Sequence, residues 1–166
     1  MFNSCKSLAL VAIVLTFGCA EKSEAPGSEA EVQEPQVTAA TLGEQQVLAT
    51  ADYLEQAPYA GADRAKGEQQ AATCKACHSF EQGGVHRVGP NLHGIFGSPV
   101  GTREGFDYST AVLEADFVWT PAALDAWLSQ PGQFLPGNRM TFVGVSDPQA
   151  RADLIAYLLE ATEAEQ

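Results

Sequence analysis

The stretch Cys74-Lys75-Ala76-Cys77-His78 decides how the rest of this chain must be built. Two thiols separated by two residues, with an imidazole directly after the second, form a C-x-x-C-H pattern. This spacing lets both thiols reach one edge of a flat macrocycle, while His78 presents a ring nitrogen to a metal at its centre. Covalent attachment of a c-type haem uses all three side chains, and a single motif predicts a single haem.

Three other uses of a cysteine pair compete with haem attachment. A structural zinc site needs four ligands, and beyond residue 20 the chain has no third cysteine and only His86 and His93 as further histidines. A thioredoxin-type redox pair requires a βαβ setting, which the sequence pattern does not predict. A disulfide could form after export, but it would leave His78 without a role. We therefore favour haem.

Methionine occurs at only two positions, and Met1 belongs to the segment that we expect to be removed. Met140 is therefore the one thioether available to the folded chain. It follows Pro136–Arg139, a turn-forming stretch, and so lies in a predicted loop. A gap-filling core methionine is the alternative interpretation, but the polar loop argues against it.

The first 20 residues have the layout of a secretory signal peptide: Lys6, then the apolar run Leu8–Phe17, then small residues. The run is too short to span a membrane, which takes about 20 residues. A small residue followed by Cys19 resembles the bacterial lipoprotein signal, although Thr16 and Phe17 depart from its usual residues. We expect cleavage after residue 18 and lipidation of Cys19, which would anchor the protein on the periplasmic face of a bacterial membrane. Ordinary cleavage, giving a soluble periplasmic protein, is the alternative.

Four regions follow from composition. Residues 1–18 form the signal peptide. Residues 19–61 are predicted to form an acidic, low-complexity tether, because much of the segment lacks the large apolar residues that would offset the entropy of ordering it; a short helix is predicted within 41–56. Residues 62–163 form the folded domain, and 164–166 a C-terminal tail.

Three helices are predicted in the domain. The first runs over Arg64–Thr73 with Asp63 as its N-cap, and the second begins at Thr120-Pro121. The third begins at a capping box over Ser146–Gln149, and its apolar stripe is Leu154, Tyr157, Leu158 and Ala161.

The connection over residues 81–118 is rich in glycine and shows no sustained strand alternation. Loops this long are unusual unless something other than secondary structure fills the centre. The prediction is therefore an all-α fold of three to five helices with long loops wrapped around one haem.

Taken together, these motifs resemble the class I cytochromes c, particularly the mitochondrial-type branch. The match runs from Ala62 to about Glu163, in the order Lys66-Gly67, Cys74–His78, Gly89–Gly97, Gly105–Tyr108, Trp119, Pro136–Phe142 and Asp153–Leu158. The resemblance implies one covalently bound haem c with thioether bonds to Cys74 and Cys77. It also implies His78 as proximal and Met140 as distal iron ligand.

The resemblance also implies roles around the haem. Pro90 would accept a hydrogen bond from His78 through its carbonyl, Leu92 would form an apolar wall, and Tyr108 and Trp119 would donate to a buried propionate. Further positions expected at the haem are Trp127, Asn138 and Phe142. Gly67 and Tyr157 would allow the first and last helices to cross closely. For the aromatic residues and Leu92, ordinary core packing is the alternative.

Several positions depart from the family pattern. Ser98 stands where many members have an arginine near the propionates, and Val112 where an asparagine is common. Trp127 replaces a tyrosine near the distal methionine, and Asn138 replaces a threonine or serine. These departures change the polar network expected around the cofactor.

The formal net charge is −12, from nine basic and 21 acidic residues. An acidic chain is unsuited to nucleic acid, and from Pro58 onward seven basic residues face 13 acidic ones. The lysine ring of the mitochondrial proteins is therefore missing, and an acidic surface favours a positively charged partner.

The function expected from the sequence is single-electron transfer between redox partner proteins of a respiratory chain. No small-molecule substrate and no catalysis are expected, because iron held by two side chains has no vacant position. Two alternatives are a fixed cytochrome subunit of a respiratory dehydrogenase or oxidase complex and a haem peroxidase or gas sensor.

Overall fold

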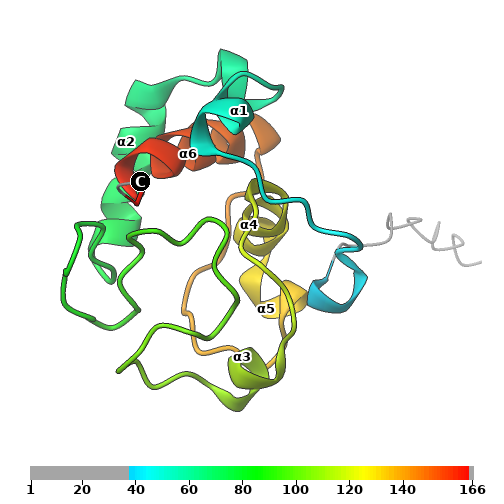
Figure 1. Cartoon of the computed structure of the whole chain (residues 1–166), viewed down its shortest axis with the longest axis vertical. Coiled ribbons are helices and arrows are strands. Elements are labelled where there is room, and N and C mark those ends of the chain that lie inside the picture. Colours follow the sequence, from blue (N-terminus) through cyan, green and yellow to red (C-terminus); the bar gives the residue numbers. More distant parts are fainter. Residues whose placement is uncertain (1–37, 165–166) are drawn as a thin grey trace, which may run out of the picture. The chain divides into compact units, whose positions relative to one another are not determined.

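A crossed pair of helices, α2 (Arg64–Lys75) and α6 (Pro148–Ala161), forms the base of the fold in the computed structural model, which describes residues 38–164. These two helices make the most extensive contact between helices in that range, and they cross in Figure 1. A Cβ atom at Gly67 would overlap the carbonyl oxygen of Asp153 and lie 2.8 Å from Cβ of Tyr157. The missing side chain at Gly67 therefore lets the two backbones approach, as predicted.

Two of the predicted helix starts are confirmed by their caps. The Asp63 carboxylate accepts hydrogen bonds from the backbone of Ala65 and Lys66, each at 3.1 Å. The Thr120 hydroxyl accepts one from the backbone of Ala123 at 3.1 Å, at the start of α4 (Pro121–Ser129). Such caps satisfy backbone N–H groups that have no partner within the helix.

The predicted capping box at the start of α6 is wrong by one residue. Asp147, not Ser146, is the N-cap, and its carboxylate accepts from the backbone N–H of Gln149 at 2.9 Å. The Gln149 side chain does not reach back to the cap but donates to Asp153 at 2.9 Å. The physical reason is Pro148, whose fixed φ makes it the first helical residue and leaves the cap position to the residue before it.

The remaining helices are short. They are α1 (Thr50–Leu54), α3 (Thr110–Glu114) and α5 (Pro131–Phe134), with 3₁₀ turns at Ala39–Thr41 and Tyr59–Gly61. Within residues 38–164 there is no strand, only an isolated bridge between Pro99 and Val118. The all-α prediction is confirmed, and only α2, α4 and α6 are longer than five residues.

Residues 38–61 pack against the domain, although the sequence places them in the tether. The side-chain amide of Gln45 donates to the Val118 carbonyl at 2.6 Å and accepts from the Val118 N–H at 2.7 Å. Leu42, Tyr53 and Leu54 pack against the core, and Tyr59 is buried in it. Composition did not reveal this docking because it depends on the backbone of Val118, which lies 73 residues from Gln45 in the chain.

The core is centred on α4, which contacts α6 and α5. Its buried residues include Leu124, Trp127 and Leu128 of α4, Phe134 of α5, and Leu154, Ile155, Leu158 and Leu159 of α6. Of the stripe predicted on α6, Leu154 and Leu158 are buried, while Tyr157 and Ala161 are half-buried.

A single buried cation ties this core to the loop before α6. Arg151 is 9% exposed and donates to the Asp125 carboxylate at 2.8 Å and to the carbonyls of Val145 and Ser146. Because all three guanidinium nitrogens donate to oxygen atoms, burial of the guanidinium is tolerated.

In Figure 1 the long loop after α2 and the loop from α5 to α6 both extend from the crossed helices toward α3. None of the helices in the described range is long and apolar enough to cross a membrane. The predicted signal peptide, including Cys19, lies outside the described residues.

We predict that Gly67→Ala lowers the free energy of unfolding by about 1–3 kcal/mol, because the new methyl group forces α2 away from α6. Gly132→Ala is the matched control, since Gly132 also lies in a helix but has nothing within 4 Å of an added Cβ. Denaturant unfolding of both variants checks this. Equal stabilities for the two would show that the crossing tolerates a side chain.

Candidate functional site

The C-x-x-C-H segment lies at the end of α2. Cys74 is in the last turn of the helix, and the backbone N–H groups of Cys77 and His78 both donate to its carbonyl, at 3.0 and 2.9 Å. Both thiols are free and half-buried. Burial raises the pKa of the Cys74 thiol, so this group is neutral near pH 7. The tight turn brings the two thiols and the imidazole into one short segment.

The His78 ring is fixed in one orientation by the next loop. Its Nδ1 lies 2.6 Å from the carbonyl oxygen of Pro90, which can only accept, so Nδ1 carries the proton. Burial lowers the pKa of His78, while the Pro90 carbonyl acts in the opposite direction. A neutral imidazole with its Nε2 lone pair free is the form that binds a metal.

Gly89 packs directly against this ring. A Cβ atom at Gly89 would overlap Cε1 of His78 and lie 2.7 Å from both ring nitrogens. The Gly89 N–H also donates to the carbonyl of Cys77 at 2.9 Å. The histidine is therefore held between its own turn and the Gly89-Pro90 backbone.

The loop carrying Pro90 is held by a buried polar cluster that the sequence did not single out. The Asn91 side-chain amide donates to the Ser79 hydroxyl at 2.8 Å and to the Glu81 carbonyl at 3.0 Å. His86 accepts from the Asn91 backbone at 3.0 Å and bonds the Glu104 carbonyl at 2.9 Å. Asn91 lies within the block Gly89–Gly97, but only the folded loop shows what its side chain contacts.

Met140 lies in a loop, as predicted, and is half-buried against the core. The Asn138 carboxamide oxygen accepts from the Met140 N–H at 2.9 Å. The amide nitrogen donates to the carbonyls of Pro131 and Leu135, at 2.9 and 2.8 Å. Asn138 thus acts on the site by fixing the backbone of Met140.

Aromatic rings join the remaining predicted positions. Trp119 and Trp127 meet edge to face with centroids 5.5 Å apart, and Phe117 and Phe134 extend this cluster. Tyr108 meets Phe106 in the same way at 4.8 Å. Leu92, Trp119 and Phe142 are half-buried and pack against the core. These rings form an apolar environment beside the two loops.

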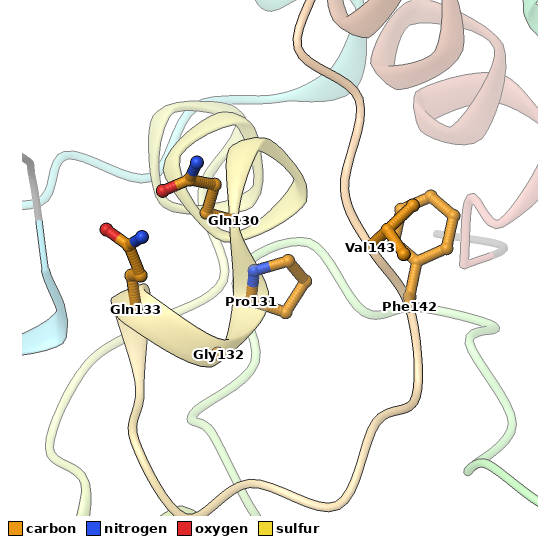
Figure 2. A pocket seen from close by; sticks show the side chains of 6 residues that line it. All are labelled: Gln130, Pro131, Gly132, Gln133, Phe142 and Val143. Carbon is orange, nitrogen blue, oxygen red and sulfur yellow. The ribbon is translucent and has the colours of Figure 1, made fainter.

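Phe142 also lines an open hollow of about 290 Å³, shown in Figure 2. Phe142 and Val143 lie on one side of it, and residues 130–133 at the start of α5 lie on the other. Phe142 follows Met140 by two residues and belongs to the loop that Asn138 stabilises, so the hollow borders this loop.

Two buried side-chain atoms of the described residues have no partner: Nη2 of Arg103 and Oγ of Ser109. Neither residue was predicted as a site residue, because an arginine in a glycine-rich loop carries no sequence signal of burial. A buried cationic or hydroxyl donor without a partner indicates that an acceptor belongs there.

The competing uses of the cysteine pair receive no support. Among residues 38–164, no group of three or more His, Cys, Asp or Glu side chains could hold a metal ion. The same range has no sheet for a thioredoxin-type site, and the thiols are not joined to each other. A helical fold with free paired thiols and an oriented histidine defines a protein built to hold one haem.

No family model matches the chain. Individual relatives do. Cytochrome c of Chlamydomonas reinhardtii is 48% identical over 101 residues, which is 60% of this chain and 90% of that protein. Cytochrome c of Trypanosoma brucei brucei is 54% identical over 77 residues, covering 46% of this chain and 83% of that protein. Cytochrome c2 of Rhodomicrobium vannielii is 43% identical over 100 residues, covering 60% and 80%.

The chain therefore belongs to the class I c-type cytochromes. It is a carrier of electrons with one covalent haem c, not an enzyme, and it works with protein redox partners. The residues described fit such a group: the glycine beside His78 leaves room for the oriented ring, and the two unpaired buried donors match the acidic groups of a haem.

We predict that Gly89→Ala changes the absorption bands of the haem and lowers stability, because the methyl group forces the His78 ring to turn. Gly61→Ala is the control, since Gly61 has nothing within 4 Å of an added Cβ and does not have a positive φ. Absorption spectra and unfolding midpoints of the two holoproteins provide the measurement. A Gly89→Ala spectrum identical to that of the parent protein would contradict the packing described.

Proposed function

We propose that His78 and Met140 are the two axial ligands of the haem iron, and that Cys74 and Cys77 carry its thioether bonds. The observation that supports this most is the bond from His78 Nδ1 to the Pro90 carbonyl, which leaves Nε2 as the ligating atom. Met140 is the only methionine among the described residues, and Asn138 fixes its backbone.

Each of the other predicted residues then has a task. Leu92, Trp119, Trp127 and Phe142 exclude water from the centre, while Tyr108 and Trp119 face a propionate. When bound, haem c supplies an iron that gains and loses one electron, and histidine–methionine ligation favours a high reduction potential. A centre with both axial positions filled by fixed side chains suits rapid electron exchange rather than catalysis.

We also propose that the protein acts in a respiratory chain on the periplasmic face of a bacterial membrane, held there by lipid on Cys19. A tether would raise its effective concentration near membrane partners. The proposal rests on the sequence pattern around Cys19, because this residue lies outside the described structure.

The charge distribution supports a partner with a positive surface. Acidic residues outnumber basic ones by 21 to nine, and four described cations are already in ion pairs. These pairs are Arg64–Glu160, Lys66–Asp63, Arg139–Asp107 and Arg151–Asp125. Little positive charge is left to attract an acidic partner, so electrostatic steering favours a basic one.

We predict that Met140→Ala lowers the reduction potential and lets the ferric haem bind external ligands such as imidazole, because one axial position is vacated. Val143→Ala is the control in the same loop, since its side chain is 94% exposed. Redox titration and ligand-binding spectra distinguish the two variants. If Met140→Ala keeps the parent potential and binds no ligand, Met140 is not an axial ligand.

We predict that Cys19→Ser moves the protein from the membrane fraction to the soluble periplasmic fraction. Cys5→Ser is the control, because it changes a cysteine in the part of the signal that is removed. Fractionation of cells that express each variant, followed by detection of the haem protein, provides the measurement. Retention of Cys19→Ser at the membrane would rule out a lipid anchor and favour the alternative of a subunit fixed in a complex.

A further inference from the structure

Arg103 differs from every other arginine of the chain. Arg64, Arg139 and Arg151 pair with carboxylates, and Arg87 donates to the carbonyl of Lys75 at 3.0 Å. Nη2 of Arg103 is buried without a partner, and Arg103 takes part in no ion pair within the described residues. A guanidinium nitrogen removed from water without an acceptor is costly, so the fold itself indicates that a partner is missing.

The backbone around Arg103 is shaped to turn it inward. Gly101 and Gly105 on either side have φ values of +71° and +80°, which other residues rarely adopt. The carbonyl of Arg103 accepts from the N–H of Phe106 at 3.3 Å, which closes the turn between them. The backbone of this turn is therefore fixed, and the half-buried Arg103 that it carries has its Nη2 atom removed from solvent.

Ser109 provides a second, independent donor. Its Oγ is also buried and also has no partner. Although Ser109 directly precedes α3, its hydroxyl makes no capping hydrogen bond, unlike the Thr120 hydroxyl before α4. A serine at this position ordinarily caps the helix, so its hydroxyl is left for another acceptor.

Tyr108 links these two residues. Burial raises the pKa of the Tyr108 phenol, while the backbone and the positive charge of Arg103 act in the opposite direction. Arg103 is therefore close to the phenol of Tyr108, and Ser109 is its neighbour in the chain. One guanidinium, one hydroxyl and one phenol thus lie on a single segment, and none of these three groups carries the negative charge that a guanidinium prefers as its partner.

We propose that Arg103 and Ser109 bind a propionate carboxylate of the haem, beside Tyr108. A carboxylate is the acceptor that a guanidinium fork and a hydroxyl fit best. Arg103 thereby takes the role of the arginine that many family members have at the position of Ser98. Ser98 itself does not supply a donor, because its hydroxyl already donates to the Ile95 carbonyl at 2.6 Å. The inference rests on the haem centre proposed above.

The carboxylates nearest in the chain do not serve Arg103: the exposed Glu104 makes no ion pair with it. Asp107 pairs with Arg139, and His86 lies between the Glu104 carbonyl and the Asn91 N–H. Asp107 would have to leave Arg139 to pair with Arg103, and an imidazole, which is neutral or positive, cannot neutralise a guanidinium. The propionate is therefore the counter-ion of Arg103, and Arg103 is a positioning residue that also acts on the reduction potential through its charge.

The test uses holoprotein whose haem carboxyl carbons are labelled with ¹³C, so that NMR reports the titration of the propionates directly. In Arg103→Gln, one carboxyl should protonate at a pH higher by about one unit or more, because the adjacent cation is gone. The reduction potential should fall, since removal of a positive charge favours the ferric state. Ser109→Ala should shift the same carboxyl by less.

Arg103→Lys should restore most of the parent titration, and Arg64→Gln, which removes a half-buried arginine of α2 that pairs with Glu160, should leave it unchanged. If Arg103→Gln does not accumulate, Ser109→Ala and Arg103→Lys still test the assignment. The proposal is overturned if the carboxyl titrations and potentials of all available variants match the parent protein. Mass spectrometry of each preparation separates this outcome from loss of haem attachment, which would count against the haem centre itself.

Discussion

The hydrogen bond from His78 Nδ1 to the Pro90 carbonyl is the interaction on which the site depends. It joins the end of α2 to a loop that has no regular secondary structure of its own. The bond fixes both the tautomer and the direction of the imidazole. The Asn91 cluster then holds the loop in place behind Pro90. The His78 ring, which we propose as an iron ligand, is thereby held in one orientation although it lies on a short turn.

The second half of the molecule follows the same design. Asn138 fixes the Met140 backbone with one hydrogen bond and ties the loop to α5 with two more. The loops that carry Pro90 and Met140 are thus both ordered by side-chain amides that bond to backbone groups, not by a sheet. The crossed helices α2 and α6 provide the frame, and close contact at Gly67 sets their separation. Fold and cofactor site depend on each other because the loops contribute few buried apolar residues to the core.

The positive charges of the described residues are mostly used in contacts within the protein. The described cations are used within the protein: Arg151 inside the core, Arg103 beside the site, and others in surface ion pairs. The surface is left predominantly negative, while one guanidinium nitrogen of Arg103 is buried within the fold. In the functions proposed above, partner recognition and redox tuning are governed by different residues.

The sequence by itself determined the class of protein. The spacing of Cys74, Cys77 and His78 is set by the geometry of one haem edge, and helix starts at Asp63 and Thr120 are local chemistry that a few residues encode. The sequence pattern predicts the cap of α6 one residue too early, because Ser146 and Asp147 are both good N-caps. Pro148 decides between them, since its fixed φ makes Asp147 the cap.

Only the tertiary structure decided which polar groups meet. The docking of residues 38–61 through Gln45, the cluster around Asn91 and the burial of Arg103 all depend on backbone carried in from distant parts of the chain. Local patterns encode helices and covalent attachment because those need neighbours in sequence. Hydrogen bonds across the fold need neighbours in space, which the order of the residues does not reveal.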